Sequence, residues 1–133
     1  MAQDPRPNIF PSFKYQDADG AIDWLERVAG FTRQAVFPKP GGGVAHAELT
    51  LGAGAIMLGS LDQPDPVNPW STATHGVYVY VPDADAHYAR ARAAGAEIVR
   101  ELADTPYGSR EYSMRDPGGN LWSFGTYYPE PPK

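Results

Sequence analysis

His46 and Glu48 are the residues of this sequence whose types and spacing best suit chemistry. In the segment 44–51, small or apolar residues alternate with polar ones, as on a strand, so these two side chains share one face. An imidazole beside a carboxylate could shuttle a proton or orient a cationic ligand, which makes the pair a catalytic candidate. An ordinary strand ion pair, worth about 0–1 kcal/mol when exposed, is the simpler interpretation. The sequence favours the simpler interpretation and leaves both open.

The elements that must position this pair belong to a chain built from two similar halves. The segments DADGAIDWLERVAG (17–30) and DADAHYARARAAGA (83–96) begin with the same three residues. Asp83 follows Asp17 by 66 positions, half the length of the 133-residue chain, and the same offset places AIMLG (55–59) on LWSFG (121–125). A repeat of this kind predicts one fold unit that is present twice.

Each half predicts one strand, one helix and then three further strands. Aspartates precede both helices as N-caps, and Gly30 and Gly95 end them. A connector with several prolines, residues 60–75, separates the first half (8–59) from the second (76–128). We expect strands at 9–15, 33–37, 44–51, 55–59, 76–81, 97–102, 109–115 and 120–127, and helices at about 17–29 and 84–94.

Chain length and repeat together favour a single α+β domain that spans residues 1–133. A chain of this size can bury roughly two-thirds of the surface that its unfolded form exposes. Neither half is large enough to bury one face of a sheet alone. The two halves should therefore pack their sheets around a common interior.

The composition argues against several classes of partner. The formal net charge is −5 and the basic residues are scattered, so we expect neither nucleic acid nor a membrane as a partner. The absence of cysteine excludes disulfides, thiolate metal ligands and a cysteine nucleophile. No apolar run approaches the roughly 20 residues that span a bilayer, and the N-terminal segment lacks a signal-peptide pattern. These features favour a cytoplasmic protein.

Four segments resemble the vicinal oxygen chelate superfamily, which includes glyoxalase I, bleomycin-resistance proteins, fosfomycin-resistance enzymes and extradiol dioxygenases. They are QDADGAIDWLERVAGF (16–31), HAELTLGAGAIML (46–58), VYVPDADAHYARARAAGAEI (79–98) and REYSMRDPGGNLWSFGTY (110–127). The chain looks closest to glyoxalase/bleomycin-resistance-like proteins of bacteria. The resemblance implies two βαβββ modules whose eight strands form a curved mixed sheet around a cleft, with the helices on the convex side. It also implies a homodimer, because many members are dimers.

Metal-dependent members of this superfamily place one ligand in the first strand and one in the fourth strand of each module. Counting from the family's motifs assigns these positions to Phe10, Met57, Gly76 and Ser123. A catalytic zinc needs about three nitrogen, oxygen or thiolate ligands, which these side chains do not supply. We therefore predict that the chelate has been lost and expect no metal or other cofactor. His75 could still reach inward through a bulge, although a loop or capping role fits it better.

The cleft implied by the resemblance should be aromatic and soft, with a few polar groups, which is the usual profile of a small-molecule site. Trp70 and Tyr107 could close over the opening, although Trp70 could equally pack at a module or dimer boundary. Phe10 and Met57 could bind a ligand or merely fill the interior. The candidate ligand-binding residues are Phe10, Lys14, His46, Glu48, Met57, Trp70, Tyr78, Tyr80, Tyr107, Arg110, Tyr112 and Ser123.

Two of these candidates, Arg110 and Tyr112, depend on how the repeat is applied. The offset of 66 makes Tyr112 a counterpart in the second half of His46, and Arg110 lies two residues earlier. On the opposite face of the sheet, Trp122 and Phe124 should pack against a helix. His87, on the second helix, is expected to face solvent.

These patterns support two main classes of function. The favoured one is a metal-free protein that binds or sequesters an aromatic or cationic small molecule, which suits the acidic net charge. The alternative is a lyase or isomerase of the same superfamily, either metal-dependent or using His46 and Glu48 as acid and base. An accessory dimer without a ligand is a third interpretation, which a cleft filled by side chains would favour.

Overall fold

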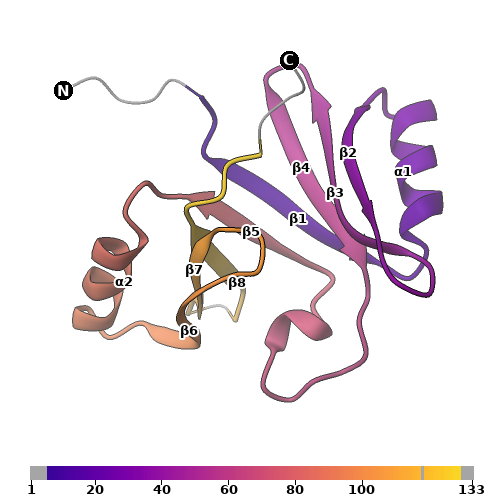
Figure 1. The fold of residues 1–133 in the computed structure, drawn as a ribbon. Coiled ribbons are helices and arrows are strands. Elements are labelled where there is room, and N and C mark those ends of the chain that lie inside the picture. Colours follow the sequence, from indigo (N-terminus) through magenta and orange to yellow (C-terminus); the bar gives the residue numbers. More distant parts are fainter. Residues whose placement is uncertain (1–5, 118, 130–133) are drawn as a thin grey trace.

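A computed structural model describes residues 6–117 and 119–129 and shows one eight-stranded sheet with two α-helices (Figure 1). The elements are β1 (Ile9–Tyr15), α1 (Ala18–Arg27), β2 (Thr32–Pro38), β3 (Val44–Leu51), β4 (Gly54–Ser60), the 3-10 helix η1 (Pro69–Ser71), β5 (His75–Tyr80), α2 (Ala84–Ala93), β6 (Glu97–Asp104), β7 (Arg110–Arg115) and β8 (Leu121–Gly125). The strand order across the sheet is β2-β3-β4-β1-β5-β8-β7-β6. Both halves thus have the βαβββ order that the sequence predicts.

The two halves join edge to edge through their first strands. β1 pairs in parallel with β4 in the first half, and β5 pairs in parallel with β8 in the second. β1 and β5 then pair antiparallel, with Phe10 opposite Tyr78. Figure 1 shows α1 and α2 at the two outer flanks, so the inner face of the sheet lies between the halves. The predicted α+β class, with a mixed sheet of two modules, is confirmed.

The helices begin where the sequence predicts, because aspartate caps are present. The carboxylates of Asp17 and Asp83 each accept a hydrogen bond from the amide three residues ahead, at 2.9 and 3.0 Å. These bonds satisfy amide groups that the first turn leaves free. Gly30 and Gly95 follow the helices with φ of 81° and 86°, a conformation that favours glycine. Among the described residues, no helix is long and apolar enough to cross a membrane.

Each helix covers its own apolar cluster on the outer face of the sheet. α1 inserts Ile22 and Leu25 among residues of β3 and β4. In the second half, Phe124 packs beneath α2, with Trp122 partly buried beside it. The prediction that these two aromatics point toward a helix is confirmed.

The hairpin between β7 and β8 is one residue longer than its counterpart between β3 and β4. Glu48 pairs with Met57 across nine positions, whereas Ser113 pairs with Ser123 across ten. Since Met57 and Ser123 correspond at the offset of 66, Glu48 corresponds to Ser113 at an offset of 65. Successive strand residues point to opposite faces, so the extra residue exchanges the faces of β7 relative to a strict repeat.

Candidate ligand-binding cleft

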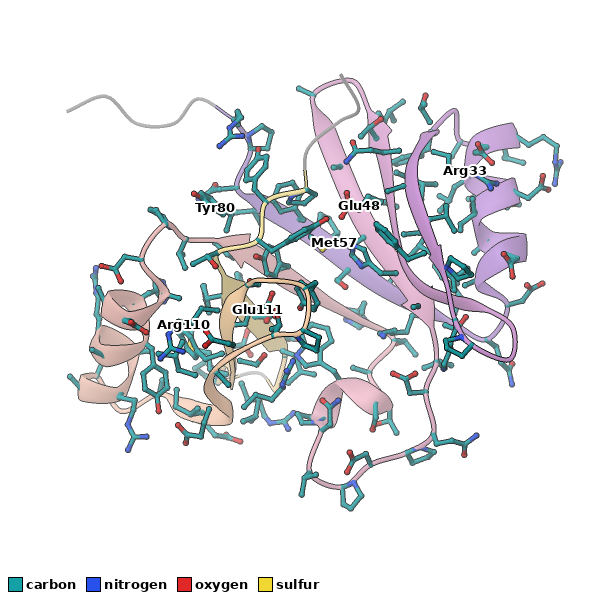
Figure 2. All side chains as sticks on the ribbon, in the orientation of Figure 1. Arg33, Glu48, Met57, Tyr80, Arg110 and Glu111 are labelled. Carbon is teal, nitrogen blue, oxygen red and sulfur yellow. The ribbon has the colours of Figure 1, made fainter. Side chains whose placement is uncertain are left out.

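The inner face of the sheet holds a cleft of about 480 Å³, lined by both halves of one chain. Ser12 and Met57 line it from the first half, and Tyr78 and Ser123 line it from the second. Figure 2 places the labelled Met57 between the two halves of the molecule. The volume lies within the range of about 300–1,000 Å³ that is typical of small-molecule sites.

Most of the residues selected from the sequence are brought together here. Lining the cleft are Lys14, His46, Met57, Trp70, Tyr78, Tyr107 and Ser123. Their part in binding a ligand stays a prediction. The remaining candidates lie outside the lining for three different physical reasons: Glu48, Phe10, Tyr80, Arg110 and Tyr112.

Phe10 and Tyr80 lie on the inner face but are covered by the C-terminal segment. The ring of Tyr128 lies 5.6 Å from that of Phe10 and 5.1 Å from that of Tyr80, both edge to face. The hydroxyl of Tyr128 donates to the carbonyl of Pro7 at 2.5 Å. Phe10 is only 2% exposed, so filling the interior describes it better than binding a ligand.

The expectation that Tyr112 and Arg110 face the cleft is wrong. Tyr112 is 1% exposed in the cluster beneath α2, where burial raises its pKa to about 12. Arg110 pairs at the surface with Asp85 at 2.6 Å and Asp104 at 3.1 Å, and Figure 2 shows it toward α2. The prediction used a uniform offset of 66, and the longer second hairpin reverses the faces of β7.

The expectation that His87 faces solvent is also wrong. Its ring stacks on Phe124 with centroids 4.3 Å apart, and its Nδ1 lies 2.6 Å from the hydroxyl of Tyr112. Burial, and then the positive charge of Arg90, lower the pKa of His87. His87 therefore belongs to the layer between α2 and the sheet, away from the cleft.

Glu48 is 2% exposed and is surrounded by hydrogen-bond donors. His46 Nε2 lies 2.8 Å from Oε2, and Gln34 Nε2 donates to Oε1 at 2.9 Å. The hydroxyl of Tyr127 donates a further bond to Oε2. Burial is the largest single influence and raises the pKa of Glu48, but the three donors together outweigh it and lower this pKa. Glu48 is thus an ionised carboxylate behind His46 and Tyr127, which themselves line the cleft.

Glu111 is a cleft residue that the sequence reasoning missed. It lines the cleft from β7 and is 7% exposed. Its Oε1 accepts a hydrogen bond from the hydroxyl of Tyr107 at 2.9 Å. Gly125 leaves room for it, since a Cβ there would lie 2.4 Å from Glu111 Cγ. The longer turn before β8 was the signal that could have found Glu111, because it places odd-numbered residues of β7 on the inner face.

Trp70 occupies the space that a side chain at position 76 would need. A Cβ on Gly76 would lie 2.1 Å from the ring of Trp70. The indole Nε1–H donates to Ser113 Oγ at 3.3 Å, and Asn68 accepts from the Trp70 amide at 3.1 Å. The connector therefore places an aromatic ring against the sheet as part of the cleft wall.

The residues present do not fit the divalent ion of the metal-dependent superfamily members. Phe10 and Gly76 have no side-chain lone pair, and Met57 and Ser123 offer only weak neutral donors. His75 is exposed, and its Nδ1 lies 3.4 Å from Thr74 Oγ1. Within residues 6–117 and 119–129, no group of three His, Cys, Asp or Glu residues could hold a metal ion.

Four aromatic rings form a row along one wall of the cleft, from β2 to the loop before β7. Centroid distances are 6.0 Å from Phe37 to His46, 6.2 Å from His46 to Tyr127, and 5.8 Å from Tyr127 to Tyr107. Phe37 and Tyr107 end the row and are 51% and 60% exposed. In the middle of the row, the hydroxyl of Tyr78 positions Tyr127 by donating a hydrogen bond to its carbonyl at 2.5 Å. The row offers aromatic surface to a ligand at both ends.

Comparison with known proteins defines the class to which this fold and cleft belong. The model of the Glyoxalase/Bleomycin resistance protein/Dioxygenase superfamily matches residues 14–124. The chain therefore belongs to this superfamily, as the sequence motifs indicate.

Individual proteins are also similar to this chain in sequence or in fold. Uncharacterized protein Rv0887c of Mycobacterium tuberculosis is 32% identical over 132 residues, which cover 94% of this chain and 77% of that protein. A superfamily member from Vibrio splendidus 12B01 has a TM-score of 0.67 at 21% identity, covering 88% of this chain and 96% of that one. Methylmalonyl-CoA epimerase from Mycobacterium tuberculosis has a TM-score of 0.70 at 21% identity, covering 97% and 93%. At such identities the two solved structures show the fold alone.

Proposed function

We propose that this chain is a metal-free small-molecule-binding protein of the glyoxalase/bleomycin-resistance type, whose ligand is an aromatic or cationic compound. The observation that carries the proposal is a cleft of about 480 Å³ with aromatic walls and a buried carboxylate, Glu111, in its lining. Apolar and aromatic walls with a few convergent polar groups are typical of ligand sites. The mismatch between the family's metal positions and a divalent ion supports binding without a metal.

The expected affinity follows from the area and polarity of the cleft. Burying about 150 Å² of a flat ring contributes roughly 4 kcal/mol, and the loss of translational and rotational freedom on binding, about 4 kcal/mol or more, offsets it. Micromolar binding corresponds to a net free energy of about 8 kcal/mol. A polar anchor in the cleft must therefore supply much of the affinity for a small aromatic ligand.

The test is calorimetry on chelator-treated protein with naphthylmethylamine and other flat aromatic compounds. We expect saturable binding with one ligand per chain, and weaker binding to Trp70→Phe, because this variant removes part of the wall. Trp24→Phe is the matched control, since Trp24 lies on α1 and is 52% exposed. Absence of any binding heat would reject the proposal, and turnover of a substrate would then favour an enzyme.

A second candidate function is favoured by the 2.8 Å contact between His46 and Glu48. In a lyase or isomerase, His46 could exchange a proton with a substrate in the cleft while Glu48 stabilises the imidazolium. Glu48→Gln should then abolish turnover without lowering ligand affinity much. A metal-dependent version predicts about one divalent ion per chain after purification, measured by elemental analysis.

We also propose that the chain forms a homodimer, as many superfamily members do. Trp24 lies on α1 and Val28 directly follows it as the C-cap; they are 52% and 56% exposed, so they offer apolar surface for association. Light scattering should give twice the chain mass of 14.4 kDa. Both walls of the cleft come from one chain, so binding should survive dilution to the monomer.

A further inference from the structure

We infer that Glu111 anchors a basic nitrogen of the ligand, so that the ligand class is a flat aromatic ring linked to a protonated amine or amidine. This inference rests on the proposed binding function. It specifies a positive charge on the ligand and names Glu111 as the residue that binds this charge. Glu111 is 7% exposed, and it belongs to the lining of the cleft. The carboxylate is therefore removed from bulk water but reachable by a molecule inside the cleft.

The hydrogen bonds of Glu111 leave acceptor positions open. A carboxylate has about four acceptor positions, and among the described residues Glu111 accepts one hydrogen bond, at 2.9 Å from the hydroxyl of Tyr107. In the part of the chain that the structure describes, Oε2 has no protein donor and no basic side chain lies within 4.0 Å of the carboxylate. An ammonium or amidinium group would supply charged donors that the described residues do not provide to Glu111.

The other buried carboxylate is not equally available. Glu48 already accepts from Gln34, His46 and Tyr127. It also lies behind two residues of the cleft wall rather than in the lining. A cationic ligand at Glu48 would have to displace these donors, whereas one at Glu111 would add a partner.

The surroundings of Glu111 specify the rest of the ligand. Tyr107, which donates to Glu111, exposes 60% of its surface at the end of the aromatic row. Trp70 contributes a second ring to the same cleft. A ring joined to the cation by a short link can therefore contact aromatic surface while its nitrogen binds Glu111.

Basic residues in the lining give the main competing prediction. Lys14 and Arg100 also line the cleft, and Lys14 lies 3.8 Å from Asp62. A ligand anchored by its own carboxylate would bind these residues instead. The sign of the preferred ligand charge therefore distinguishes the two arrangements.

The experiment compares three probes of the same size by calorimetry: naphthylmethylamine, naphthylmethanol and naphthoate. The wild-type protein should bind the amine about tenfold or more tightly than the alcohol, because hydrogen bonds to charged groups contribute about 1.5–3 kcal/mol. Glu111→Gln should abolish this preference and leave binding of the alcohol within about twofold. Tyr107→Phe should increase the preference, since it removes the one donor that the described residues supply to Glu111.

Glu101→Gln is the charge-matched control, because Glu101 pairs with Arg92 at the surface, with a side chain 66% exposed. It should keep the amine preference, which excludes an effect of net charge alone.

The inference is overturned if the preference survives in Glu111→Gln, if Glu48→Gln removes it instead, or if naphthoate binds best. In those cases the proposed binding function still stands. If no probe binds to any variant, both fail together. Circular dichroism of each variant confirms that a lost preference is not lost folding.

Discussion

Glu48 and Glu111 lie in opposite halves of the molecule, and both are almost fully buried, at 2% and 7% exposure. Three side chains donate to Glu48, whereas the described residues supply one donor to Glu111. We infer from this difference that burial alone does not decide which carboxylate is available to a ligand. The hydrogen-bond partners decide it, because a satisfied carboxylate gains little from another donor.

The repeat explains how the two halves came to differ. At the true offset of 65 for these strands, Glu111 corresponds to His46, and Ser113 corresponds to Glu48. In the first half, the side chain of His46 contacts the carboxylate of Glu48. In the second half, the equivalent position holds a carboxylate, Glu111, and Ser113 accepts a hydrogen bond from Trp70. We infer that the first half supplies a rigid wall and the second half supplies the anchor.

The largest effect should come from truncating each carboxylate in turn. Glu48→Ala leaves three donors and a cavity behind, so we expect a loss of about 3 kcal/mol in the free energy of unfolding. Glu111→Ala should cost about 1 kcal/mol, because the described residues supply it with one donor, on Tyr107, a residue that is 60% exposed. Urea denaturation of both variants measures the difference. Equal losses would break the comparison between the two carboxylates.

The next effect separates the tyrosines that hold the two carboxylates. Tyr127→Phe removes a charged hydrogen bond to Glu48 and should lower the free energy of unfolding by about 1.5 kcal/mol. Tyr107→Phe should cost less than about 0.5 kcal/mol, since water can reach its site. Both variants lose one tyrosine hydroxyl group, so their thermal unfolding temperatures compare the two hydrogen bonds directly. A larger decrease in unfolding temperature for Tyr107→Phe than for Tyr127→Phe would contradict this prediction.

A smaller effect should appear in the pH dependence of stability. The pKa of Glu48 is lowered in the folded protein, so the unfolded chain binds this proton more tightly. The resulting stabilisation is present above the ordinary pKa of 4.5 and is lost as the pH falls through the lower folded value. The stability advantage of wild type over Glu48→Gln should therefore shrink on acidification, as followed by urea unfolding. An advantage that grows toward acid would reverse the assigned sign.

The smallest effect is expected at Arg110, which lies on the outer face of the second half. Its two ion pairs are exposed and screened by solvent, so Arg110→Ala should leave the free energy of unfolding nearly unchanged. Calorimetry should show unchanged affinity for the aromatic amine. A loss of ligand binding in this variant would place Arg110 back in the cleft.

The sequence predicts the fold well because its signals are local. Asp17 and Asp83 cap helices within a few residues of themselves, and alternation identifies most strands. The faces of β7 were predicted incorrectly because one extra hairpin residue changes the phase of every later position. Tyr127 illustrates a second limit, since it was expected in the last strand and instead follows β8 to reach Glu48. A contact between residues so far apart in sequence leaves no trace in either segment alone.

The central claim is that one chain binds an aromatic cation in its own cleft without a metal, and the indole N–H signals of its tryptophans test it directly. Trp70 lines the cleft, whereas Trp24 is exposed on α1 and Trp122 packs on the outer face. Titration of chelator-treated, nitrogen-15-labelled protein with naphthylmethylamine should move the Trp70 signal, saturate at one ligand per chain, and leave the other two signals in place. No saturable shift of Trp70, or a shift that appears only after zinc is added, would contradict the claim.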